Sequence, residues 1–238
     1  MKEKTLFALS YPFSSPDHSF LFEGGSFVRT DHLADDYRDR YPVLAAGSNQ
    51  SPDQLARKYG GGAEWGILAA EKALLFDFDV VYAAHLAGYG SVPATFQRSE
   101  GTSVSVFILW LTELQLNHMH KTESNYFFEL LPKIKVETEF GLVITEAFAY
   151  SARMGCLNHG GDPLALQEIP ATNRRFSEGD QIIAQRYVRD MIAPRAGLNK
   201  FILETIEQQR ERRRRIEILS NASLPLLYER ELVIDLGE

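Results

Sequence analysis

Residues 41–55, YPVLAAGSNQSPDQL, combine a short apolar run, a Gly-Ser-Asn turn and the start of a helix. Ser51 is suited to cap this helix, Pro52 to occupy its first position, and Gln54 to complete a capping box. A turn of small residues that leads into a helix N-terminus directs backbone N–H groups toward one spot, which suits an anion. We therefore expect the loop at residues 47–49 to bind a substrate.

Length and composition restrict the class of protein. The chain has 238 residues, of which 45% are hydrophobic, enough for one sizeable core. Its 25 basic and 32 acidic residues give a net charge of −7, which argues against nucleic acid as the main partner. The single cysteine, Cys156, excludes an internal disulfide and a cysteine-rich metal site, and fits a cytoplasmic protein. No run approaches the roughly 20 apolar residues of a membrane span, so no membrane partner is expected.

Local patterns divide the chain into three parts. Residues 1–40 are expected to form an irregular N-terminal arm packed on the core, and residues 41–150 the core itself. Residues 151–238 are expected to form a loop, two helices and a short final strand, packed on the same domain. We expect strands at 43–46, 73–84, 93–97, 104–111 and 232–234, a hairpin of 133–139 with 142–150, and helices at 52–59, from Thr112, at 177–192 and at 198–219. Several strands with few helices between them predict an α+β fold.

The helix that begins at Thr112 is expected to carry an acidic side chain inward. Leu116, Met119 and Glu123 are spaced i, i+3, i+7, so they share one face of the helix. A carboxylate at the inner end of an apolar stripe is partly desolvated, which favours a role as a base. The alternative is an exposed glutamate, or one paired with His120.

Taken together, these residues resemble the γ-glutamylcyclotransferase-like family over roughly residues 42–150. The family's first signature is a strand ending in Tyr-Gly-Ser-Asn and followed by a helix. Its second is an Ala-Thr strand, a glycine turn, a hydrophobic strand and a helix with an acidic end. In this chain the two signatures read Ala46-Gly47-Ser48-Asn49, and then VPATF at 92–96, Glu100-Gly101, residues 104–111, MHKTE at 119–123 and Tyr126.

The resemblance implies a small mixed β-barrel flanked by helices, here with a C-terminal helical extension. It also implies a transferase of glutathione metabolism that cyclises a γ-glutamyl amino acid or amine to 5-oxoproline and releases the amine. On this reading Glu123 is the catalytic acid and base, and Gly47, Ser48, Asn49 and Tyr150 bind the small-molecule substrate. No metal and no organic cofactor is expected.

Two departures from the family pattern leave a second reading open. Ala46 replaces the motif tyrosine, and His120 replaces the aspartate that often precedes the acidic residue by three positions. Either change could alter the activity, so the alternative is a non-catalytic small-molecule-binding module of the same fold. A third reading is an acidic scaffold protein whose arginine-rich helix recruits a partner.

Two other groups of residues are weighed against a structural role. Cys156 lies near His159 in a glycine-rich loop, where we expect an inert thiol rather than a Cys–His pair. His118 and His120 are two positions apart, which places them on different sides of a helix and argues against a shared metal.

The late helix carries an arginine cluster at positions 210 and 212–215. We expect a solvated face balanced by Glu207, Glu211 and Glu217 rather than a nucleic-acid site. The apolar residues of the same helix are expected to pack on the barrel or on a second copy of the chain, which would make a homodimer.

Overall fold

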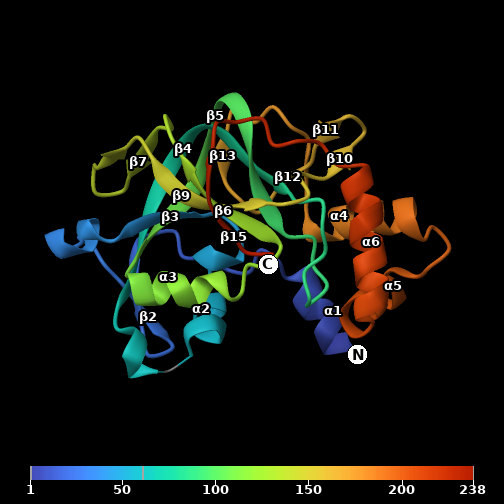
Figure 1. Ribbon diagram of the computed structural model, residues 1–238, viewed down its shortest axis with the longest axis horizontal. Helices are drawn as coiled ribbons and strands as arrows, with labels where there is room; N and C mark the ends of the chain where they lie inside the picture. The colour runs from blue at the N-terminus through green and yellow to red at the C-terminus, as the bar shows by residue number, and fades with distance from the viewer. Residues whose placement is uncertain (1, 61, 238) are drawn as a thin grey trace.

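The computed structural model describes residues 2–60 and 62–237. In this part of the chain six α-helices flank a large sheet, which confirms the α+β prediction (Figure 1). The helices are α1 (Lys2–Leu9), α2 (Pro52–Tyr59), α3 (Glu113–His120), α4 (Gln181–Ile192), α5 (Leu198–Glu207) and α6 (Gln209–Asn221). Figure 1 shows α2 and α3 together below the sheet at the left, and α1 with α4, α5 and α6 at the right.

Most strands belong to one sheet of 13 strands, whose main path is β14-β12-β4-β5-β3-β9-β6-β15. Along this path the strands are β14 (Glu178–Gly179), β12 (Ala165–Leu166), β4 (Leu68–Tyr82), β5 (Ala94–Leu111), β3 (Tyr41–Ala45), β9 (Ala147–Ala152), β6 (Tyr126–Leu131) and β15 (Glu231–Asp235). The β3–β9 and β12–β14 pairs are parallel, and the other pairs on the path are antiparallel. Because β14 and β15 end the path, the described pairings do not close the sheet, and the expected barrel is not confirmed.

The remaining strands are short. Off the main path, the sheet also includes β1 (Phe20–Glu23), β2 (Ser26–Arg29), β7 (Val136–Thr138), β8 (Val143–Ile144) and β13 (Ala171–Thr172), and a separate pair is formed by β10 (Asn158–His159) and β11 (Asp162–Pro163). The antiparallel β7–β8 pair confirms the turn end of the hairpin expected between 133–139 and 142–150. The rest of that prediction is wrong, because residues 147–150 belong to β9, which pairs with β3 and β6. No helix in the described ranges is long and apolar enough to cross a membrane.

The two faces of the central strands bury different apolar clusters. On β5, Phe107 and Leu109 pack in a cluster that includes Leu116 and Met119 of α3, whereas Ile108 packs in the cluster that includes residues of α4, α5 and α6. This alternation is the two-residue period of a strand buried on both faces. The sheet therefore separates the α2–α3 layer from the C-terminal helices.

β4 and β5 form the longest pair, and the structure corrects the prediction of two separate strands at 93–97 and 104–111. β5 is continuous, but its pairing with β4 skips residues 99–102. Opposite this excursion Asp77 has a left-handed φ of 59°, and its carboxylate accepts the Gly101 N–H at 2.8 Å. The predicted turn is thus a bulge within the pair, because the long strands continue to pair on both sides of it.

The N-terminal arm is more regular than its composition indicates. The expectation of an irregular arm is wrong, because α1, β1 and β2 lie within residues 1–40. Phe20 and Phe22 point the same way from β1 and are 0% and 3% exposed. Pairing of β1 with β4 extends the sheet, and this long-range contact has no signal in the local sequence.

Two predicted boundaries in the late helices are also wrong. The helix expected from residue 177 begins at Gln181, because Asp180 caps it and accepts the Ile183 N–H at 2.8 Å. The single helix expected at 198–219 is two helices, α5 and α6. Gln208 separates them with a φ of −114° and a ψ of 90°, which is not helical.

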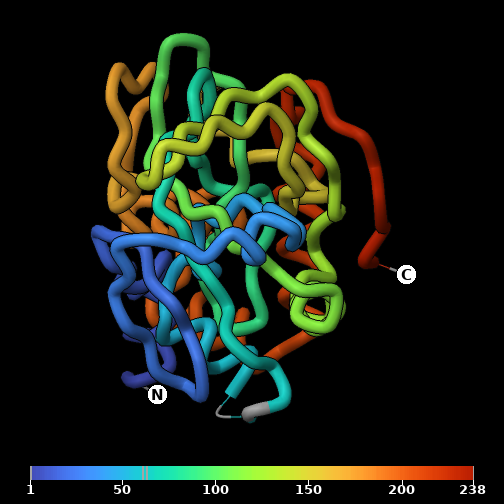
Figure 2. The backbone as a smooth tube through the Cα atoms, turned by 90° about the vertical axis from the view of Figure 1, so that its left-hand side faces the viewer, coloured from blue at the N-terminus to red at the C-terminus, as the bar shows by residue number. Residues whose placement is uncertain are grey.

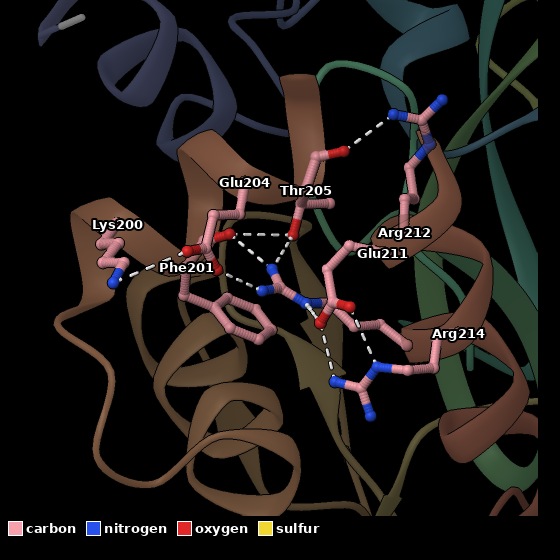
Figure 3. Close-up of polar contacts among 8 residues, drawn as sticks. Lys200, Phe201, Glu204, Thr205, Glu211, Arg212 and Arg214 are labelled. Carbon is pink, nitrogen blue, oxygen red and sulfur yellow. Dashed lines mark hydrogen bonds and ion pairs between the residues drawn. The ribbon is translucent and has the colours of Figure 1, made fainter. Parts of the chain in front are cut away.

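The break at Gln208 lets α6 return along α5 and bury an arginine. Arg215 is 1% exposed and donates to the Phe201 carbonyl and the Thr205 hydroxyl, both at 2.6 Å. Figure 3 shows Glu204 and Glu211 at the same cluster, and Arg215 pairs with them at 2.7 and 3.0 Å. The expected solvated arginine face is therefore wrong at position 215, where four acceptors compensate for the burial of the charge.

Helices α1, α4 and α5 support the loop that joins β4 to β5. Gln185 of α4 donates to the Gly90 carbonyl at 2.6 Å, and Ser91 donates to the Ala8 carbonyl at the end of α1 at 2.7 Å. A Cβ at Gly90 would lie 2.8 Å from the Ile206 side chain, so only glycine fits there. Figure 2, turned by 90°, shows the blue N-terminal segment and the red C-terminal segment on opposite sides of the molecule.

We expect the Arg215 cluster to make stability depend on pH in the acid range. A hydrogen bond from Arg214, together with Arg215, lowers the pKa of Glu211 from 4.5 to about 2. Because the folded-state pKa is depressed, this stabilisation is complete above about pH 4.5 and is lost as the pH falls toward about 2. Urea denaturation of wild type and Glu211→Gln across this range should give a difference in unfolding free energy that shrinks with acidity.

The matched control for this measurement is Glu217→Gln, which changes an exposed glutamate of the same helix. Its difference from wild type should stay small and constant. A Glu211→Gln difference that did not vary with pH would contradict the assigned role of Glu211.

Candidate functional site

A pocket of about 590 Å³ lies where the loop after β3, helix α2, the turn after α3 and the start of β5 meet. The loop at residues 87–89, which α1, α4 and α5 support, forms another part of its wall. The structure brings all five sequence-predicted site residues to this pocket: Gly47, Ser48, Asn49, Glu123 and Tyr150.

The loop after β3 is a short 3-10 turn, η2 (Ser48–Gln50). The Gln50 and Ser51 N–H groups donate to the Gly47 and Ser48 carbonyls at 3.3 and 3.1 Å. Helix α2 then begins at Pro52 and ends at Tyr59, as predicted. The predicted capping box is wrong, because the Ser51 side chain makes no cap and its carbonyl accepts the Gln54 N–H instead.

Glu123 is buried beyond the end of α3 rather than within the helix. The helix starts at the predicted place, where Thr112 and Gln115 form a capping box, but it ends at His120. The Glu123 N–H donates to the His120 carbonyl at 3.2 Å in the turn that follows. The inward direction holds nevertheless, because Glu123 is only 8% exposed and Met119 is fully buried.

The carboxylate of Glu123 joins three elements. Its Oε1 atom accepts a hydrogen bond from the Asn49 side-chain amide at 3.1 Å and forms an ion pair with the Lys58 ammonium group. The side chains of Lys58 and Glu123 are 15% and 10% exposed, so this pair is largely shielded from solvent. The alternative pairing of Glu123 with His120 is not found among the described ion pairs, and Lys58 is the charged partner instead.

The two histidines of α3 serve different neighbours. His120 Nδ1 lies 2.9 Å from the Tyr150 hydroxyl, and burial lowers the pKa of His120 and raises that of Tyr150. His118 Nε2 lies 2.6 Å from the Lys58 carbonyl. Tyr150 is thus held by the residue that departs from the family pattern, while His118 ties α3 to α2.

Several pocket residues were missed by sequence reasoning, among them Tyr11, Gln54, Lys58, His85 and Tyr89. Gln54 and Lys58 had a local signal, because both follow the predicted loop on a helix of known start. Tyr11, His85 and Tyr89 come from segments that no short motif marks.

Some buried polar atoms of the pocket residues have no partner within the described chain. Asn49 Oδ1, Gln54 Nε2 and His85 Nδ1 are buried and make no hydrogen bond there. Burial lowers the pKa of His85 to about 3, so its ring is neutral near pH 7. Because buried polar groups are usually paired, this unused capacity is typical of a site that binds a ligand.

Other candidates do not join this pocket. Cys156 is fully buried, burial raises its pKa to about 11, and its sulfur lies 3.7 Å from the Leu224 carbonyl oxygen. His159 instead packs against the Tyr187 ring. Within residues 2–60 and 62–237, no cluster of three His, Cys, Asp or Glu side chains is arranged to hold a metal ion.

No protein-family model matches the chain, and no curated protein matches it. Solved structures similar to it include a gamma-glutamyl cyclotransferase, with 14% identity, 82% of this chain and 95% of that chain covered, and a TM-score of 0.36. They also include an uncharacterized protein from Homo sapiens, with 15% identity, 92% of this chain and 96% of that chain covered, and a TM-score of 0.35. The first of these structures carries the name of the family that the sequence motifs resemble.

We expect Gly47 to be required by the close approach of a neighbour. A Cβ at this position would lie 2.3 Å from the Tyr11 hydroxyl oxygen and 3.2 Å from the Ala94 Cβ. Gly47→Ala should therefore displace the loop or Tyr11 and lower the unfolding free energy by roughly 1–3 kcal/mol. Urea denaturation measures this cost.

Gly88→Ala is the matched control, because it changes another pocket glycine whose added Cβ would meet nothing within 4 Å. Its cost should stay within about 0.5–1 kcal/mol. Equal costs for the two variants would show that Tyr11 does not constrain position 47.

Proposed function

We propose that this chain cyclises a γ-glutamyl amino acid or amine to 5-oxoproline and releases the amine. The observation that supports this most directly is the buried carboxylate of Glu123 facing the Gly-Ser-Asn loop across one pocket. A pocket of about 590 Å³ is large enough for a substrate of this size.

The reaction requires one proton to move twice. The α-amine nitrogen of the substrate attacks its own γ-carbonyl carbon, so that a new C–N bond closes the five-membered ring and the carbonyl oxygen becomes an oxyanion. Attack requires the neutral amine, so the substrate ammonium group first gives one proton to solvent, and Glu123 then takes the proton that the nitrogen loses as the ring closes. When the intermediate collapses, the bond to the leaving nitrogen breaks, and Glu123 returns the proton to that nitrogen.

Asn49 and the loop backbone prepare the site for this chemistry. The Asn49 amide orients the carboxylate at 3.1 Å. The loop backbone is already held by the hydrogen bonds from the Gln50 and Ser51 amides to the Gly47 and Ser48 carbonyls, so the backbone amide of Asn49 needs little reorganisation to face a negative oxygen.

Lys58 must exchange partners when substrate binds. In the free protein it pairs with Glu123 and would compete with the substrate amine. The α-carboxylate of a γ-glutamyl substrate offers Lys58 a new partner, and the α-amine can then take its place beside Glu123. This exchange keeps every buried charge paired. Arg57, whose guanidinium stacks over Phe7 at 3.8 Å, adds a second cation to the same wall.

The second candidate function is a binding module that holds a small carboxylate or amide without converting it. Two observations favour it: Ala46 replaces the motif tyrosine, and the Lys58–Glu123 pair occupies the base. The two candidates differ in turnover, so the test is product formation.

Glu123→Gln should abolish turnover if the proposal is correct. The purified protein is incubated with a panel of γ-glutamyl amino acids and amines, and 5-oxoproline is measured by mass spectrometry. Loss of the acid and base should lower kcat by about 100-fold or more. Glu113→Gln, an exposed glutamate on α3, is the matched control. Product formation by Glu123→Gln at the wild-type rate would refute the role of Glu123, and ligand binding without any product from wild type would favour the module.

Lys58→Met should weaken recognition of the α-carboxylate. The substrate pair for this test is a γ-glutamyl amide and the matching 4-aminobutanoyl amide, which lacks the α-carboxylate and cyclises to 2-pyrrolidinone. Loss of a charge-assisted contact should lower kcat/KM for the γ-glutamyl amide by about 10-fold or more relative to the 4-aminobutanoyl amide. Lys121→Met, an exposed lysine beside α3, should affect neither. Equal losses on both amides would contradict the proposed partner exchange.

A further inference from the structure

Tyr11 places a phenol hydroxyl from the N-terminal segment against the Gly-Ser-Asn loop. The residue follows α1, is 3% exposed and lines the pocket. Its hydroxyl oxygen accepts the Ala94 N–H at 2.7 Å, and the Ser48 amide also lies against this oxygen. The close approach to Gly47 leaves no room for a side chain at that position.

The hydroxyl hydrogen of Tyr11 has no acceptor in the described chain. The contacts of its oxygen are with donors, which use the lone pairs and leave the O–H bond free to donate. Burial raises the pKa of Tyr11 well above its ordinary value of 10.0, so the hydroxyl stays protonated and acts only as a neutral donor. A buried donor that faces a pocket is available to an acceptor on a ligand.

Tyr11 and Glu123 contact opposite ends of the same loop. The Tyr11 hydroxyl lies against Gly47, and the Glu123 carboxylate bonds to Asn49, two residues farther along. Two residues of extended chain span at most about 7 Å. A ligand that lies over this loop can therefore be contacted by the carboxylate and by the phenol at the same time.

We propose that Tyr11 is a catalytic residue that donates its hydroxyl hydrogen bond to the γ-carbonyl oxygen of the bound γ-glutamyl compound. This inference rests on the proposed function. As the amine attacks, negative charge grows on that oxygen, and a donor already held in position stabilises it without transferring a proton. The N-terminal arm thus supplies an aromatic hydroxyl beside Gly47, the residue after Ala46, which stands where the motif has a tyrosine.

Tyr11→Phe tests the proposal because it removes only the oxygen atom. Removal of one donor to a developing oxyanion should lower kcat by about 100-fold and change KM by less than about 3-fold. Tyr228→Phe is the matched control, since its buried hydroxyl donates to Ser151 at 2.9 Å outside the pocket. A kcat for Tyr11→Phe within about 2-fold of wild type would overturn the proposal.

A second measurement does not depend on turnover. Tyr11 is replaced by 3-fluorotyrosine, which keeps the ring and the hydroxyl, and the fluorine resonance is followed while 5-oxoproline is added. A shift of the resonance, with about 10-fold weaker 5-oxoproline binding by Tyr11→Phe, supports donation to a carbonyl oxygen even if wild type forms no product. If wild type forms no product but the resonance shifts and binding weakens, the proposed function fails and the Tyr11 contact stands. An unmoved resonance with unchanged binding overturns the Tyr11 contact, whether or not wild type turns over.

Discussion

The pocket depends on the ion pair between Lys58 and Glu123. The Asn49 amide donates a hydrogen bond to the same carboxylate oxygen. Together these contacts join the loop after β3, helix α2 and the turn after α3. Both charged side chains are largely buried, so each needs the other, and loss of either partner would leave an uncompensated charge. The contact of His118 with the Lys58 carbonyl ties the same two helices a second time. The site geometry therefore comes from two short helices that hold one another beside the sheet.

The segments before and after the motif region complete this pocket. Tyr11 reaches it from the N-terminal arm, and the loop at residues 87–89 forms a wall that α1, α4 and α5 support. The C-terminal helices are in turn held together by the buried guanidinium of Arg215. The late part of the chain, which matches none of the family motifs, thus has a structural link to the site through the β4–β5 loop.

Local patterns predicted much of the core. The bounds of α2, the capping box of Thr112 and the short strand before Gly47 follow from interactions within a few residues, and such interactions are readable from the sequence. The errors lie where contacts between distant segments determine the local structure. Arg215 is buried only because α5 and α6 separate at Gln208 and pack on each other, and β5 continues past residues 99–102 because β4 pairs with it on both sides.

The sequence by itself determined the strand, turn and helix around residues 47–49, the burial of the apolar face that ends near Glu123, and the α+β class. Only the tertiary structure decided the partner of that carboxylate and the approach of Tyr11 to Gly47. Lys58 is 65 positions from Glu123, and Tyr11 is 83 positions from its donor Ala94. Contacts over such separations depend on how the whole chain is threaded through the sheet, because no local propensity brings those side chains together.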